Sequence, residues 1–160
     1  MSLSQTNRCP PACHFRCQRQ AIYLLRIYGL ERQGRTVEVS YRSLENTPDV
    51  QRIRQDEALM AELVAYIGEH LTEIDTGLAI LPEHLLAKQA LSYSTLGVNR
   101  LANKPFDVLF EGEAGRALLP EIQSGSFASM SSRAGLVERL NNRTCMGCHQ
   151  VQSTAGFHFL

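Results

Sequence analysis

Two cysteines and a histidine form the densest group of reactive side chains in this 160-residue chain: Cys145, Cys148 and His149, spaced Cys-Met-Gly-Cys-His. Covalent attachment of haem needs two thiols spaced to meet its two vinyl groups, and an adjacent imidazole that can reach the iron. With five Cys and five His, shuffled sequences would contain this pattern roughly 1 time in 200. The spacing therefore predicts haem c bound by Cys145 and Cys148, with His149 as iron ligand.

Three other interpretations of the motif stay open: half of a structural zinc site, a redox dithiol, or reduced cysteines beside an unrelated histidine. A redox dithiol is typical of a strand end in a βαβ unit, whereas residues 133–140 before the motif have a helical pattern. Zinc needs two further ligands. The remaining thiols are Cys9, Cys13 and Cys17, whose spacing fits no common haem or iron-sulfur pattern.

The pattern does not identify the sixth iron ligand. No methionine follows Met146 in the printed sequence, so a methionine ligand would come from Met60 or Met130 unless the natural protein continues past Leu160. The other histidines considered are His70, His84 and His158. We expect the distal position to be open or methionine-bound. Arg143 could pair with a haem propionate or be solvated.

Composition excludes several classes of function. Sixteen basic residues balance sixteen acidic residues, which disfavours nucleic acid as a partner. No apolar stretch approaches the length of about 20 residues that a transmembrane helix needs, so no transmembrane segment is expected. No glycine-rich phosphate loop or Gly-x-Ser-x-Gly elbow supports an enzyme. An electron carrier or haem-binding protein is favoured over an enzyme.

The elements that must position the motif are predicted to be mostly helical. Residues 1–20 read as an irregular arm containing Cys and Pro, and residues 21–160 as one domain. An apolar run over 21–30 and an alternating segment over 36–41 predict a β-hairpin. Helices are expected at 47–71, beginning at Thr47-Pro48, and at 82–93, 113–119 and 133–140. The expected fold class is mainly α: a helical haem-binding domain with a small N-terminal β-hairpin.

The carboxy-terminal segment also resembles known families. Arg143 to Gln150 is similar to the haem-attachment segment of c-type cytochromes. Leu140-Asn141-Asn142 before the motif and Ala155 to Phe159 after it resemble the end region of exported bacterial cytochrome-c-like proteins, over about the last third of the chain. The resemblance implies haem c on Cys145 and Cys148 with His149 as proximal ligand, and it implies no particular reaction.

Residues 1–20 contain no apolar h-region of a secretory signal peptide. Covalent haem attachment follows export, so we expect a periplasmic or otherwise exported protein whose signal peptide lies outside the printed sequence. The expected function is electron transfer with a redox partner protein. The alternative is a zinc-stabilised or cysteine-bearing interaction module without redox activity, and colour and metal content would separate the two.

Overall fold

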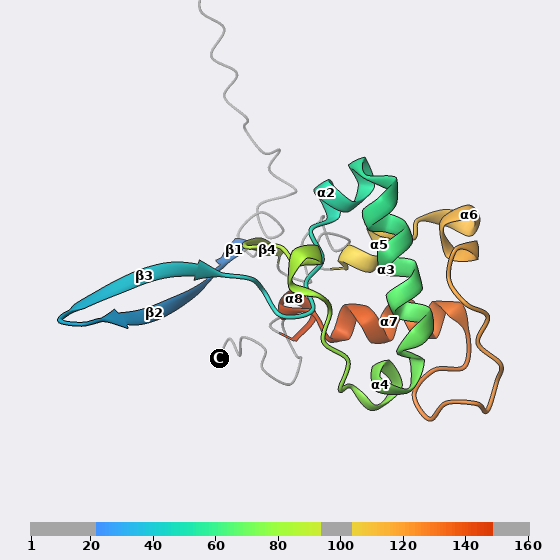
Figure 1. Ribbon diagram of the computed structural model, residues 1–160. Coiled ribbons are helices and arrows are strands. Elements are labelled where there is room, and N and C mark those ends of the chain that lie inside the picture. Colours follow the sequence, from blue (N-terminus) through green and yellow to red (C-terminus); the bar gives the residue numbers. More distant parts are fainter. Residues whose placement is uncertain (1–21, 94–103, 149–160) are drawn as a thin grey trace, which may run out of the picture.

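The computed structural model describes residues 22–93 and 104–148, in which a helical body carries a projecting β-hairpin (Figure 1). The strands are β1 (Ile22–Leu25), β2 (Ile27–Gln33), β3 (Thr36–Arg42) and β4 (Ala90–Tyr93). The helices are α2 (Val50–Gln55), α3 (Glu57–Glu69), α4 (Leu71–Thr76), the 3-10 turn η2 (Glu83–Leu85), α5 (Pro105–Leu109), α6 (Gly112–Ala117), α7 (Arg133–Asn142) and α8 (Cys145–Cys148).

The expected mainly α class is wrong, because the fold is mixed α/β. Two small antiparallel sheets are present, one formed by β1 and β4 and the other by β2 and β3. The predicted helix over 82–93 accounts for the difference: only Glu83–Leu85 form a helical turn, and Ala90–Tyr93 form a strand. Leu91 pairs with Leu24 of β1. This pairing with a segment far away in sequence overrides local helical preference.

The predicted hairpin is confirmed by β2 and β3. They pair in register from Ile27 with Arg42 to Gln33 with Thr36. The two residues between the strands include Gly34 at φ +62°, a conformation that glycine adopts without steric cost and that tight hairpins favour. The turn chemistry in the sequence therefore fixes the register of this hairpin.

The long helix predicted over 47–71 is divided into three pieces. Asp56 interrupts it with an extended backbone, and its carboxylate accepts hydrogen bonds from Ala58 N and Leu59 N, at 2.9 and 3.3 Å, at the start of α3. A short polar side chain that caps a helix competes with continuation of the preceding one. At the first piece the cap is Asp49, not the expected Thr47. Thr47 has another role, described below.

The core confirms the apolar stripe of that segment. Ile53, Leu63 and Ile67 are buried, and Met60, Val64 and Leu71 pack against them from partly buried positions. Phe106 and Phe110 stack at 6.5 Å between ring centroids and join the same cluster. Helices α6 and α7 lie close to where the sequence predicts them. One continuous apolar cluster therefore holds α2, α3, α4, α5 and α7 together.

Some expectations fall outside the described residues: the arm 1–20 with Cys9, Cys13 and Cys17, and the histidines His149 and His158. The helices within 22–93 and 104–148 include none with both the length and the apolarity needed to span a membrane.

Asp75, in the last turn of α4, fixes the loop that leads into α7. Its carboxylate accepts hydrogen bonds from Ala128 N, Ser129 N and Ser129 Oγ, at 3.0, 2.7 and 2.6 Å. Arg139 of α7 donates to the Ile74 and Asp75 carbonyls at 3.1 and 2.9 Å. The hydrogen bond from the Ser129 side chain is the main cause that lowers the pKa of Asp75 below its ordinary value.

We expect the stability contributed by Asp75 to fall in acid. Because its pKa is lower in the folded than in the unfolded state, its contribution is full above the unfolded value of about 3.8. That contribution decreases as the pH falls through the lowered folded value. Asp75→Asn should lower the urea midpoint at pH 7, and the difference from the parent protein should shrink towards pH 2.

Glu121→Gln is the matched control, because Glu121 is an exposed carboxylate outside this contact. Its urea midpoint should stay close to that of the parent protein at both pH values. A difference between Asp75→Asn and the parent protein that is equal at pH 7 and pH 2 would contradict this role of Asp75.

Candidate functional site

The two cysteines of the motif lie at the ends of one helical turn, α8. Thr144 caps it: its Oγ1 accepts a hydrogen bond from Gly147 N at 2.9 Å, and its carbonyl accepts one from Cys148 N at 2.9 Å. Residues three apart in a helix share a side. Cys145 and Cys148 are both of intermediate exposure, so the turn carries two partly exposed thiols on one side.

Gly147 allows this turn to pack directly against the end of α7. A Cβ atom built at Gly147 would lie 2.0 Å from the Asn141 carbonyl oxygen and 3.0 Å from Asn142 Cα. The obstruction is backbone, which cannot rotate away as a flexible side chain would. The second variable position of the motif is therefore restricted to glycine by packing.

The buried residue Asn141 also stabilises the junction between α7 and α8, through contacts with α5 and with Thr144. Its Oδ1 accepts a hydrogen bond from Phe106 N at 3.0 Å and its Nδ2 donates to Asp107 Oδ2 at 3.2 Å, both in α5. Its backbone carbonyl accepts the Thr144 hydroxyl at 2.8 Å. The end of α7, the start of α5 and the cap of α8 are thus joined through one residue.

Thr47 ties the motif to a segment 98 residues earlier. Its Oγ1 accepts a hydrogen bond from Cys145 N at 3.0 Å, and the Cys145 thiol donates to the Glu45 carbonyl at 3.5 Å. Burial is the main cause that raises the pKa of Cys145 above its ordinary value, and the contact with the Thr47 side chain partly offsets it. Cys145 is therefore a protonated thiol near neutral pH.

The segment that contains Thr47 is itself held by the stretch after η2. Ala87 N donates to the Thr47 carbonyl at 2.9 Å, Leu44 N to the Ala87 carbonyl at 2.8 Å, and Asp49 N to the Leu85 carbonyl at 2.9 Å. The segment 44–49, which contacts the motif through Thr47, is therefore hydrogen-bonded through its backbone to residues 85–87. Sequence reasoning missed Thr47, Asn141 and Gly147 as supports. Only the hydroxyl of Thr144, directly before Cys145, is a capping signal visible in the sequence.

An open groove lies beside the buried side chain of Met146, the residue that follows Cys145 in the motif. Its walls come from the start of the α2 segment, from β4 and the residues before it, and from α5. Its polar members are Thr47, Asp49, Gln51 and Gln89, and its apolar members are Pro48, Val50, Ala87, Ala90, Leu91, Pro105, Val108 and Met146. A flat apolar macrocycle requires an apolar wall next to its attachment point. Of the described motif residues, Met146 alone lines the groove, which thus adjoins the turn that carries the two thiols; His149 lies outside the described residues.

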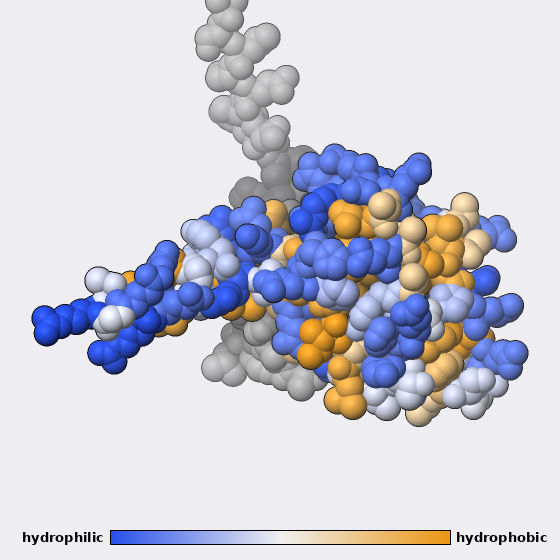
Figure 2. Space-filling view, viewed as in Figure 1, coloured by the Kyte–Doolittle hydropathy of each residue, from blue (hydrophilic) through white to orange (hydrophobic). Residues whose placement is uncertain are grey.

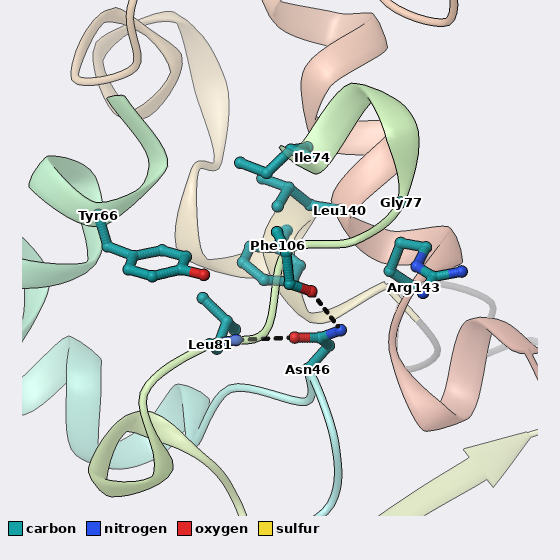
Figure 3. A pocket seen from close by; sticks show the side chains of 9 residues that line it. Asn46, Tyr66, Ile74, Gly77, Leu81, Phe106, Leu140 and Arg143 are labelled. Carbon is teal, nitrogen blue, oxygen red and sulfur yellow. Dashed lines mark hydrogen bonds between the residues drawn. The ribbon is translucent and has the colours of Figure 1, made fainter. Parts of the chain in front are cut away.

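A second cavity lies in the core and is too small for any cofactor. It measures about 20 Å³ and is lined by Tyr66, Ile74, Phe106 and Leu140 among others (Figure 3). Such a volume is close to that of one water molecule. Asn46 also lines this cavity and fixes the stretch 79–81, because its Nδ2 donates to the Ala79 carbonyl at 3.0 Å and its Oδ1 accepts from Leu81 N at 2.9 Å. Arg143 borders the cavity and is exposed.

The upstream histidines have structural partners. The ring of His70 stacks on Tyr66 at 4.1 Å, and its Nδ1 lies 2.9 Å from the Tyr66 carbonyl oxygen. His84 is exposed, as expected, and its Nε2 lies 2.7 Å from Glu62 Oε1. Neither residue lines the groove beside Met146.

The two candidate methionines belong to the core. Met130 is buried in it and Met60 packs against it. Neither lines the groove beside Met146. Among residues 22–93 and 104–148, no three His, Cys, Asp or Glu side chains are grouped so that they could hold a metal ion.

The comparisons with known proteins gave no relative, so the functional argument rests on the geometry described above. No protein-family model matches the chain, and neither the curated proteins nor the solved structures compared with it gave a match.

We expect Gly147→Ala to disrupt the thiol-bearing turn. The new methyl group would overlap the Asn141 carbonyl oxygen, so α8 must move away from α7, at a cost of about 1–3 kcal/mol. Thermal unfolding should show the loss, and the rate of alkylation of Cys145 should rise as its contacts with Glu45 and Thr47 break.

Gly68→Ala is the matched control, because Gly68 lies within α3 and a Cβ atom added there would have nothing within 4 Å. It should stabilise the protein by roughly 0.5–1 kcal/mol, since alanine favours a helix. Equal melting temperatures for the two variants would contradict the packing described for Gly147.

Proposed function

We propose that the chain binds haem c covalently through Cys145 and Cys148, with His149 as iron ligand, and acts in electron transfer. The observation that carries the proposal is the Cys-x-x-Cys-His motif, with its two cysteines at either end of one capped helical turn. The turn is held by Thr47, Thr144 and Asn141. The resemblance to c-type cytochromes supports the same assignment.

The cysteines suit the attachment chemistry. Each thiol would add across one vinyl group: sulfur bonds to one vinyl carbon, the thiol proton goes to the other, and the double bond becomes single. No oxidant or leaving group is needed. Burial raises the pKa of Cys145, so this thiol carries the proton that the addition transfers. Bound haem iron would supply a one-electron couple.

Other features near the motif support the proposal. The apolar wall of Met146, Val108 and Leu91 would exclude water from one side of the group. Burial of this kind and the axial ligands are what set a haem potential. A redox partner protein would then donate or accept the electron, in the periplasm or another exported compartment where haem c is attached.

We expect protein made in an exporting host with the haem-maturation apparatus to be red and to keep its haem through acid-acetone extraction. Thioether bonds survive this treatment, whereas coordinated haem does not. The double variant Cys145→Ser, Cys148→Ser should lose the extraction-resistant haem. Stoichiometric zinc without a Soret band would instead favour the cysteine-bearing interaction module.

The matched control replaces three cysteines that the motif does not use, Cys9, Cys13 and Cys17, with serine. The triple variant should keep covalent haem in the parent amount, because the spacing of these residues fits no haem or cluster pattern. Loss of haem in this variant would show that the arm takes part in the site.

The proximal ligand can be tested separately from attachment. His149→Ala should change the absorption spectrum of the holoprotein strongly, because the imidazole follows Cys148 directly. His70→Ala and His84→Ala should keep both haem and spectrum, since Tyr66 and Glu62 already engage these rings. His158→Ala should do the same. A change from low spin to high spin in His158→Ala would demonstrate bis-histidine ligation.

A further inference from the structure

The hairpin β2–β3 projects from the helical body (Figure 1) and has two different faces. On one face several polar side chains pair with one another, although the Ser40 hydroxyl is buried without a hydrogen-bond partner. Arg42 crosses over Gly29 and pairs with Glu31. Gln33 Nε2 donates to Glu38 Oε2 at 2.7 Å, which relieves the direct opposition of Glu31 and Glu38 in the register.

The opposite face is apolar and exposed. The register places three cross-strand pairs on it: Tyr28 with Tyr41, Leu30 with Val39, and Arg32 with Val37. Leu30 is 72% exposed, and its four apolar neighbours on this face are each more than half exposed. Hydrophobic residues are visible along the projecting hairpin in Figure 2. We name this surface the hairpin face.

Such a face is unusual on an isolated protein. A two-stranded ribbon with one uncovered apolar side is marginally stable in water. The five apolar side chains expose on the order of 500 Å² together, the size of patch that marks an interaction site. Two such faces in contact would bury on the order of 1,000 Å², the lower limit of a specific interface.

The order of side chains along the hairpin face is complementary to the same face of a second copy. The pair Leu30 with Val39 lies in the middle, with an aromatic pair at the base and Arg32 towards the turn. A two-fold axis through the middle pair would set Arg32 of each copy against Tyr28 of the other. The Tyr41 ring already has a cation near it, because Arg26 lies 5.6 Å from its centroid. The second copy would add a matching contact at Tyr28.

We propose that the hairpin face binds the hairpin face of a second copy of this chain, in antiparallel orientation about Leu30 and Val39. The interface is isologous: the same patch serves both copies, and the aromatic end of one meets the cationic end of the other. The two ribbons pack face to face as a small sandwich. The inference does not depend on haem binding.

The test is sedimentation velocity of the full chain over a wide range of protein concentration. The parent protein is expected to dimerise. Leu30→Lys and Val39→Lys should each raise the dimer dissociation constant at least ~100-fold, because both copies then bring a charge to the axis. Circular dichroism should be unchanged, since Leu30 and Val39 are exposed in the single chain.

Gln33→Lys is the matched control, because it adds the same charge on the opposite face and keeps a partner in Glu38. It should change the dissociation constant by less than about threefold. The orientation is tested by Arg32→Gln and Tyr28→Leu, each expected to weaken the dimer several-fold, with the double variant little weaker than either single one. Additive effects would overturn the orientation.

A parent protein that is monomeric at every concentration would overturn the proposal and leave the face to another protein or to another segment of this chain. A dimer that survives Leu30→Lys and Val39→Lys would overturn it too, because its interface would lie elsewhere. Measurements on protein without haem give the same answers, so a failure here is distinguishable from a failure of haem attachment.

Discussion

The hydrogen bond between Cys145 N and Thr47 Oγ1 is the contact on which the candidate site depends. It joins the end of the described chain to a segment near its beginning, and Thr47 is almost fully buried. The same residue accepts Ala87 N through its carbonyl. A hydroxyl in the interior is stabilising only if its partners are kept. The position of the thiols is therefore coupled to the position of the segment between the hairpin and α2.

Polar residues supply the other fixed points of this fold. Asn141 joins α7 to α5, Asn46 holds the stretch 79–81, and Asp75 holds the loop before α7. Asn46 and Asp75 hold loop segments that lie outside helices and strands, and Asn141 holds two helices at their ends. The apolar cluster provides cohesion, while these side chains decide which loop lies where.

Local signals allowed much of this fold to be predicted from the sequence. Gly34, between an apolar run and an alternating segment, predicts the hairpin, and the apolar period from Ile53 to Leu71 predicts the core-facing side of α2, α3 and α4. The strand β4 could not be predicted, because its pairing with β1 depends on residues far away in sequence. The role of Thr47 was missed for the same reason. A hydroxyl before a proline resembles a helix cap until a distant partner is known.

For the motif itself, the sequence shows two cysteines three residues apart, and the described part of the chain holds them at the ends of one helical turn. What the sequence could not provide is the reason for Gly147. The need for glycine comes from the Asn141 carbonyl, whose approach depends on the packing of α7 against α5. The iron ligand His149 lies outside the described residues, so its placement stays a prediction.

The direct stacking of α8 on the end of α7 has a consequence for the order of events in making the protein. A peptide that must become helical around a cofactor loses conformational entropy at the moment of binding, which weakens apparent affinity. Here the entropy of ordering Cys145 to Cys148 is lost when the domain folds, through contacts that involve no cofactor. Under the function proposed above, the chain would thus meet an attachment apparatus as a preorganised template rather than as an extended peptide.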